Sequence, residues 1–336
     1  MRLRRIPLVL LILTGIGLMT IIWWQRHKEY SPLISIASTG LLIAENLFLI
    51  LNRELIIDIL EHCITPLKRL AIKARINQLP QSKRHMADEK VAWYTHAKGH
   101  FLIAHGGGGA LQRYANSCEA IEKSMRDGFH VIEVDVSMTA DNIPVLSHDF
   151  NPDEELYWRH WPSSAEFLST LLDGRYHPLS LETLLKDYEA WDGVFFLDTK
   201  ITPTGKDVCK DILAKVLSYV PANAKYKLVM QLHNMRETMP LRNLLKNNPR
   251  LKERKNFWFH ANGSTALLPD MLDNEVQTIS IPQTTINSSS DLDMFIKHGI
   301  QCFAFSTNHI NRAKDLFSFG VTGVFTDTLS PKLLER

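Results

Sequence analysis

Two carboxylates separated by one residue interrupt the apolar run "VIEVDV" at 131–136. Side chains at positions i and i+2 of a strand point to the same face, so Glu133 and Asp135 are expected to project together. Like charges held close repel, and their burial is costly unless a cation compensates. Carboxylate oxygens suit a hard divalent cation such as Mg²⁺ or Ca²⁺. Asp198, which closes the run "VFFLD", offers a third ligand. The pattern therefore predicts a divalent-metal site, whereas its apolar neighbours disfavour a pair of surface carboxylates on an edge strand.

Two histidines stand at comparable places, directly after apolar runs. His105 follows "FLIA", and His148 comes soon after "IPVL". Imidazole titrates near neutral pH, so two histidines flanking a metal can divide the general-base and general-acid roles. For any single one of the 14 histidines, an ordinary core or surface position is the default interpretation. The catalytic prediction depends on both residues following strands that frame the carboxylate pair.

Four consecutive glycines, Gly106–Gly109, follow His105. Glycine has no Cβ, so successive backbone N–H groups can turn toward an anion and form a phosphate-binding nest. On this interpretation Gly106 and Gly107 contact substrate. A merely flexible loop is the alternative, and the sequence leaves both open.

These residues need a scaffold that brings strand ends together. From about residue 100 onward, short apolar runs alternate with helical patterns. The strand candidates are residues 101–104, 131–136, 194–199, 227–232, 256–261, 276–281, 301–306 and 322–326, and helices are expected at 118–127, 181–191, 206–219 and 290–298. Eight strands in βα alternation predict an α/β fold, a (β/α)₈ TIM barrel, whose active site lies at the C-terminal ends of the strands. A doubly wound open sheet is the competitor, but it usually has fewer strands, and no GxGxxG follows the first run.

The segment "IAHGGGG…YANSCEAIEKSMRDGFHVIEVDVSMTADNIPVLSHDF" resembles the glycerophosphodiester phosphodiesterase family and its phosphatidylinositol-phospholipase-C-like relatives. The likeness covers roughly residues 100–330. His105, Glu133 with Asp135, and His148 match the family's first histidine, its strand carboxylates and its second histidine. Asn116 stands in the Asn-Thr position, and Asp198 with Lys200 stand where Glu and Lys are usual. "GVFTD" near the C-terminus looks like the family's last strand.

The resemblance implies a metal-dependent phosphodiesterase in which His105 and His148 are catalytic. It also implies Glu133, Asp135 and Asp198 as metal ligands and a substrate-binding role for Asn116. Lys200 would stabilise the negative charge that develops on phosphate. Three departures bear on this: the Arg expected after the first histidine is Gly106, the acidic residue expected before the Asn is Ala115, and the third ligand is shortened to aspartate.

The N-terminus carries a long uncharged run, Ile6–Trp24, after the basic start "MRLRR". About 20 apolar residues span a bilayer as a helix, and Trp23 and Trp24 suit its interface. A cleaved signal peptide would have a shorter apolar region and a small-residue cleavage site. The pattern therefore predicts a retained N-terminal transmembrane helix.

A second apolar stretch, Pro32–Leu51, is interrupted by Glu45 and Asn46. It either spans, lies at the interface or packs on the main domain. The following segment at 55–76 is amphipathic and either touches anionic headgroups or packs on the domain with a solvated basic face. Its basic residues are Lys68, Arg69, Lys73 and Arg75. We therefore expect a transmembrane anchor at 1–30, a second hydrophobic segment and amphipathic linker at 31–95, and the barrel at 96–336.

Charge around the first run sets the expected orientation. The three arginines before it outweigh Arg26 and Lys28 after it, which places the N-terminus in the cytoplasm. One span puts the barrel outside the cytoplasm and two spans return it, so the sequence predicts a membrane protein without deciding the side of its catalytic domain.

The near-neutral charge of the chain disfavours nucleic acid as a partner. Lys plus Arg number 38 against 36 Asp plus Glu among 336 residues, a net charge of +2, and no recognition motif indicates nucleic acid. The expected substrate is a glycerophosphodiester or the head-group phosphodiester of a (lyso)phospholipid, the latter favoured by the anchor. Two alternatives remain open: a phospholipase that forms a cyclic phosphate, and a catalytically weakened barrel that binds phospholipid headgroups. The oligomeric state is not indicated.

Overall fold

The chain is seen in a computed structural model. It describes residues 65–86, 100–108, 114–148, 150, 160–200, 208–232, 241, 243 and 257–334. The chain divides into two compact units after Gln81. In the first unit the described helix is α4 (Thr65–Gln78). It begins inside the predicted amphipathic segment at 55–76 and ends two residues after it. No helix among the described residues has both the length and the apolar character to cross a bilayer. The predicted spans at 6–24 and 32–51 lie outside those residues.

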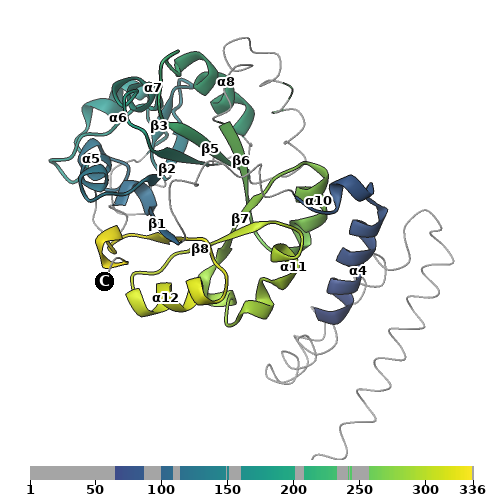
Figure 1. Cartoon of the computed structure of the whole chain (residues 1–336). Coiled ribbons are helices and arrows are strands. Elements are labelled where there is room, and N and C mark those ends of the chain that lie inside the picture. Colours follow the sequence, from purple (N-terminus) through teal and green to yellow (C-terminus); the bar gives the residue numbers. More distant parts are fainter. Residues whose placement is uncertain are drawn as a thin grey trace, which may run out of the picture. The chain divides into compact units, whose positions relative to one another are not determined.

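The second unit contains a closed barrel of eight parallel strands (Figure 1). In barrel order they are β1 (Phe101–Ala104), β2 (Val131–Met138), β4 (Val194–Thr199), β5 (Lys227–Leu232), β6 (Phe257–Asn262), β7 (Thr278–Pro282), β8 (Gln301–Phe305) and β9 (Gly323–Thr326). Strand β1 pairs in parallel with both β2 and β9, which closes the ring. A short strand, β3 (Pro144–Leu146), pairs antiparallel with the end of β2. The predicted TIM barrel is confirmed, and all eight predicted strands end within two residues of the observed bounds.

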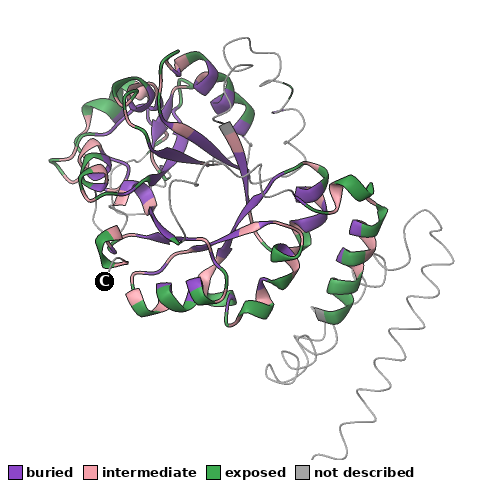
Figure 2. Ribbon diagram, in the orientation of Figure 1, coloured by how far each residue is buried: buried purple, intermediate pink, exposed green. Residues whose placement is uncertain are grey.

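Helices surround the barrel (Figure 1). Among the described residues they are α5 (Cys118–Arg126), α6 (Ser164–Ser169), α7 (Leu181–Asp187), α8 (Cys209–Tyr219), α10 (Leu268–Asp273), α11 (Asp293–Ile296) and α12 (Ile310–Ser318). Their outer faces are exposed, while the strands are almost wholly buried (Figure 2).

Two helix predictions were too long. The helix predicted at 181–191 ends at Asp187, because the backbone turns there and delivers the Val194 N–H to the His130 carbonyl, 2.8 Å away, at the start of β4. The helix predicted at 290–298 is divided into a short 3-10 turn, Ser289–Asp291, and α11.

Residues 82–86, at the end of the described part of the predicted linker region 31–95, pack against the rest of the second unit. Met86 is buried, and its N–H donates to the His298 carbonyl at 2.9 Å. Lys83 forms an ion pair with Asp273 at 2.8 Å. Gly299 permits this approach, since its φ is +72° and a Cβ there would lie 2.4 Å from the Met86 carbonyl oxygen. The predicted boundary at residues 95/96 lies in a stretch outside the described residues.

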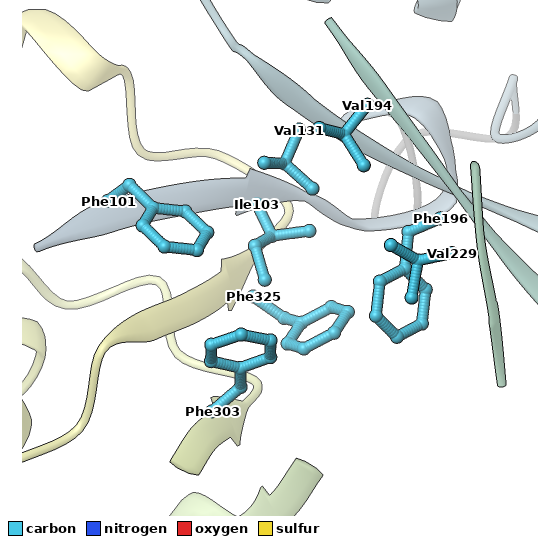
Figure 3. Packing of buried hydrophobic residues seen from close by; sticks show 8 residues of the cluster. All are labelled: Phe101, Ile103, Val131, Val194, Phe196, Val229, Phe303 and Phe325. Carbon is cyan, nitrogen blue, oxygen red and sulfur yellow. The ribbon is translucent and has the colours of Figure 1, made fainter. Parts of the chain in front are cut away.

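A hydrophobic cluster fills the barrel interior (Figure 3). Its buried members come from six strands and are Phe101, Ile103, Val131, Val194, Phe196, Val229, Phe303 and Phe325. The Phe196 and Phe325 rings meet edge to face with centroids 5.5 Å apart, a favoured aromatic geometry. Side chains two residues further along each strand point the same way. Most of the inward positions that follow this apolar floor are polar, and they form the barrel mouth. Phe305, two residues beyond Phe303, is the apolar exception.

One polar residue is enclosed in the core. His260 on β6 is fully buried, and it packs against Phe196 and Phe303. Its two ring nitrogens pair with the hydroxyls of Thr278 and Ser280 at 2.8 and 2.7 Å. Burial lowers the pKa of His260 to about 3, so the ring stays neutral at all ordinary pH values.

His260 should make folding stability depend on pH. Between about pH 6.5, the ordinary histidine pKa, and about 3, only the unfolded chain binds a proton at this residue, so stability falls as pH drops below 6.5. Each pH unit costs up to roughly 1.4 kcal/mol. His260→Gln removes this titration while keeping hydrogen-bonding groups. Urea unfolding from pH 7.5 to 5 should therefore show a smaller loss of stability in the variant, and parallel pH profiles would contradict this account.

Candidate functional site

Strand register brings the predicted carboxylates together at the barrel mouth. Asp135 on β2 lies opposite Asp198 on β4, and Asp198 lies opposite Gln231 on β5. Glu133 lies one inward position below Asp135. One oxygen from each of Glu133, Asp135 and Asp198 falls within 4.8 Å of the others. The structure thus assembles the predicted three-carboxylate cluster.

Glu133 is the most deeply placed of the three. Its side chain is 2% exposed, and its Oε2 accepts a hydrogen bond from the Gly106 N–H at 2.7 Å. Its Oε1 is buried and has no hydrogen-bond partner among the described residues. Burial, followed by repulsion from Asp135, raises the pKa of Glu133 well above the usual range for a carboxyl group. A buried carboxylate oxygen without a donor is costly, and a bound cation would remove that cost.

Asp135 is positioned by Asn116. The Asn116 amide donates from Nδ2 to Asp135 Oδ2 at 2.8 Å, and its Oδ1 accepts the Asp135 N–H at 3.0 Å. Asn116 has a φ of +62°, which asparagine tolerates better than most residues, and it precedes Ser117, the N-cap of α5. The structure therefore gives Asn116 a positioning role toward Asp135. Its predicted contact with substrate stays a prediction.

Lys200 lies among the carboxylates. Its Nζ is 2.7 Å from Asp135 Oδ1 and also pairs with Asp198 Oδ2. The other oxygen of Asp198, Oδ1, accepts a hydrogen bond from Gln231 Nε2 at 2.5 Å. Burial alone would lower the pKa of Lys200, but the charges of Asp135, Asp198 and Glu133 outweigh it and raise the pKa. Lys200 is therefore an ammonium ion that offsets part of the carboxylate repulsion.

His105 directly follows β1 at the same mouth. Its Nδ1 lies 2.7 Å from Oδ1 of Asp327, and the other oxygen of Asp327 accepts from Asn308 Nδ2 at 2.8 Å. Burial would lower the pKa of His105, yet the hydrogen bond to Asp327 and the charges of Glu133 and Asp135 raise it to about 9. Because Nδ1 is engaged, Nε2 is the nitrogen left to act on a substrate.

Asp327 and Asn308 were not predicted as site residues. Asp327 closes the run "GVFTD" after β9, so it satisfies the same rule, an acidic residue at a strand's C-terminal end, that identified Asp135 and Asp198. Asn308 follows β8 in a loop, and its Oδ1 accepts from the Thr326 hydroxyl and from the N–H groups of Asp327 and Thr328. No local sequence pattern distinguishes such a residue.

His148 lies just beyond β3 and is exposed. The preceding Ser147 N–H donates to the carbonyl of Asp135 at 3.1 Å, which fixes this segment beside the end of β2. The Ser137 hydroxyl donates to the Ser147 carbonyl at 2.9 Å and holds the same turn. The structure therefore places His148 at the carboxylate end of the barrel, and its catalytic role stays a prediction.

The first three glycines of the run, Gly106–Gly108, form a tight turn. Gly106, Gly107 and Gly108 have φ values of +55°, +75° and +90°, the region that glycine adopts without strain. The Ser124 hydroxyl donates to the Gly107 carbonyl, and a Cβ on Gly108 would lie 2.1 Å from that hydroxyl oxygen. Close packing on α5 therefore requires glycine. The Gly106 N–H donates to Glu133, so it is not directed at a phosphate in this structure. The predicted phosphate-binding role of Gly106 and Gly107 stays a prediction.

The donor set fits a hard divalent cation. Three carboxylates converge at the site, and two of their buried oxygens, Glu133 Oε1 and Asp135 Oδ1, have no hydrogen bond within the described part of the chain, although Asp135 Oδ1 lies 2.7 Å from the Lys200 ammonium. Oxygen ligands of this kind are those that Mg²⁺ and Ca²⁺ take. The structure thus supports the predicted metal-binding cluster without identifying the metal.

Comparison with known proteins identifies the family of the chain and proteins of similar fold. The model of the glycerophosphoryl diester phosphodiesterase family matches residues 105–330. Among solved structures, the chain is similar to an Oleispira antarctica phosphodiesterase in complex with the product sn-glycerol-3-phosphate: identity is 18%, the TM-score is 0.58, and the match covers 71% of this chain and 97% of that one.

Two glycerophosphodiester phosphodiesterases are also similar in fold. The protein from Parabacteroides distasonis has 17% identity and a TM-score of 0.54, with 71% of this chain and 97% of that chain covered. The protein from Thermotoga maritima has 15% identity and a TM-score of 0.53, with 72% and 100% covered. No curated protein matches the chain.

Asp327 should set the protonation of His105. Asp327→Asn removes the charge that holds the His105 proton, so the His105 pKa should fall from about 9 toward the ordinary value near 6.5. NMR titration of the histidine ring protons in EDTA measures this. Asp315→Asn, an exposed change on α12, is the matched control and should leave the curve unchanged. An unshifted His105 in Asp327→Asn would show that this pair does not govern the site.

Proposed function

The chain belongs to the glycerophosphoryl diester phosphodiesterase family of phosphoric diester hydrolases, and we propose that it cleaves glycerophosphodiesters or lysophospholipid head-group phosphodiesters at the barrel mouth. One observation carries the proposal: a buried three-carboxylate cluster lies beside a histidine paired with an aspartate. The sn-glycerol-3-phosphate in the Oleispira antarctica structure supports a glycerol phosphate product here.

Glu133, Asp135 and Asp198 would hold the divalent cation. Such a cation would neutralise a phosphodiester oxygen and lower the pKa of the attacking water. Two neighbouring residues would orient these ligands. Gly106 binds one oxygen of Glu133 and Asn116 binds one oxygen of Asp135, which leaves the second oxygen of each carboxylate for the cation.

The two histidines would exchange protons with the substrate. Asp327 holds His105 by Nδ1 and favours its protonated form, so His105 Nε2 is suited to donate a proton to the leaving-group oxygen. His148 would then take the proton of the attacking water. Lys200 would stabilise negative charge on the phosphate oxygens.

The N-terminal region favours a lipid-borne substrate and a membrane location. Helix α4 contains no acidic residue, and its basic residues are Lys68, Arg69, Lys73 and Arg75. Leu67 and Leu70 on the same helix are 41% and 50% exposed. Exposed leucines among basic residues suit contact with anionic headgroups. Together with the apolar run at 6–24, this supports a membrane-anchored enzyme.

The decisive assay is cleavage of a panel containing a glycerophosphodiester and a lysophospholipid, with Mg²⁺, Ca²⁺ or EDTA and products resolved by mass. We expect metal-dependent release of a phosphomonoester. A cyclic phosphate would instead show that a substrate hydroxyl is the nucleophile. Metal binding without turnover would indicate a barrel that only binds headgroups.

Variants assign the roles. Glu133→Gln should lower kcat/KM by roughly 10³-fold, since it removes a ligand charge from the site, and His105→Ala and His148→Ala should each lower it by roughly 10²-fold or more. Glu182→Gln is the matched control, because Glu182 on α7 is exposed and pairs with Lys186. Hydrolysis that survives both histidine changes would refute the assignment.

A further inference from the structure

Lys200 pairs with two of the three carboxylates that would hold a metal. Its ammonium contacts Asp135 Oδ1 and Asp198 Oδ2, and the side chain is only 17% exposed. We propose that Lys200 is the resident cation of the three-carboxylate site and that a divalent cation binds by displacing it. This inference rests on the proposed function in taking Glu133, Asp135 and Asp198 as the cation site.

The hydrogen bonds divide the carboxylate oxygens into two groups. Each carboxylate has one oxygen anchored by a neutral donor. The anchored oxygens and their donors are Glu133 Oε2 with the Gly106 N–H, Asp135 Oδ2 with the Asn116 amide, and Asp198 Oδ1 with the Gln231 amide. These donors belong to the backbone or to neutral side chains, so they can remain in place when a cation binds.

The second oxygen of each carboxylate is available to a cation. Glu133 Oε1 has no hydrogen bond within the described residues, whereas Asp135 Oδ1 and Asp198 Oδ2 are in contact with Lys200. A divalent cation that binds one oxygen from each carboxylate would have three ligands. It would compete with Lys200 for two of them, Asp135 Oδ1 and Asp198 Oδ2. Metal binding here is an exchange of one cation for another.

Charge indicates why the exchange is favourable. Lys200 supplies one ammonium to a cluster of three carboxyl groups, and its ion pairs are with the two aspartates and not with Glu133. A divalent cation supplies twice the charge and satisfies the oxygen that Lys200 leaves buried and unpaired. Before that exchange, Lys200 limits the repulsion and lets the cluster fold without metal.

The exchange gives Lys200 two successive roles. While paired with Asp135 and Asp198, its ammonium is not available to a phosphate. Displacement by a divalent cation frees it at the barrel mouth, where it can contact a phosphate oxygen. Cation binding therefore prepares the anion site as well as neutralising the carboxylates, and binding of inorganic phosphate should be tighter with the cation present.

A measurement on the unmodified full chain tests the exchange without substrate. Lysines are labelled briefly with an amine-reactive ester, and the modification of Lys200 is quantified by mass spectrometry in EDTA and in saturating Mg²⁺ or Ca²⁺. Displacement predicts several-fold faster labelling of Lys200 with the cation. Lys83, paired with the exposed Asp273, is the internal control and should not change. Unchanged or slower labelling of Lys200, with binding verified by calorimetry, would overturn the proposal, as would the absence of any cation binding.

A variant gives an independent test. Lys200→Met should unfold at a lower temperature in EDTA, bind Mg²⁺ or Ca²⁺ roughly tenfold tighter, and show a larger cation-induced rise in Tm. Lys83→Met removes the same charge from the surface and should match the wild type. Equal or weaker cation affinity in Lys200→Met would contradict the exchange. The two proposals fail in different experiments. If only the proposed function is wrong, the cation still speeds the labelling of Lys200, but no phosphodiester of the panel is hydrolysed.

Discussion

Mutual repulsion among three buried carboxylates is the constraint on which the polar structure of the barrel mouth depends. Glu133, Asp135 and Asp198 converge because the strand register places Asp135 opposite Asp198 and Glu133 on the same face of β2 as Asp135. The backbone of Gly106, the amide of Asn116 and the ammonium of Lys200 each offset part of that repulsion. None of them donates to Glu133 Oε1, which has no hydrogen bond among the described residues and which a bound cation would satisfy.

The apolar barrel interior makes this arrangement rigid. Several inward polar positions stand two residues beyond a packed hydrophobic one, as Asp198 stands beyond Phe196 and Asp327 beyond Phe325. Side chains fixed by such a floor hold their geometry, which an electrostatic catalyst needs before its substrate arrives. The candidate catalytic and metal-binding residues thus lie at strand ends and in the loops directly after them, and the packed strands fix their positions.

Much of this could be predicted from the sequence, because it is encoded locally. Strand alternation and the i, i+2 spacing of Glu133 and Asp135 identified the barrel and the carboxylates. What could not be predicted depends on distant contacts: Asn308 reaches Asp327 only through the fold, and the turn of Gly106 toward Glu133 depends on packing against α5. The helix predicted at 181–191 was too long, because the need to start β4 overrides local helical preference. The membrane spans lie outside the described residues and stay predictions.

The central claim is that the barrel mouth is a cation site built from three carboxylates, and diffraction can test it directly. A crystal soaked in Mn²⁺, which replaces Mg²⁺ or Ca²⁺ at oxygen-ligand sites and scatters anomalously, would locate the ion without reference to activity. The account predicts an anomalous peak within bonding distance of Glu133, Asp135 and Asp198. A mouth without a peak, in a crystal whose cluster is intact and accessible to solvent, would contradict it.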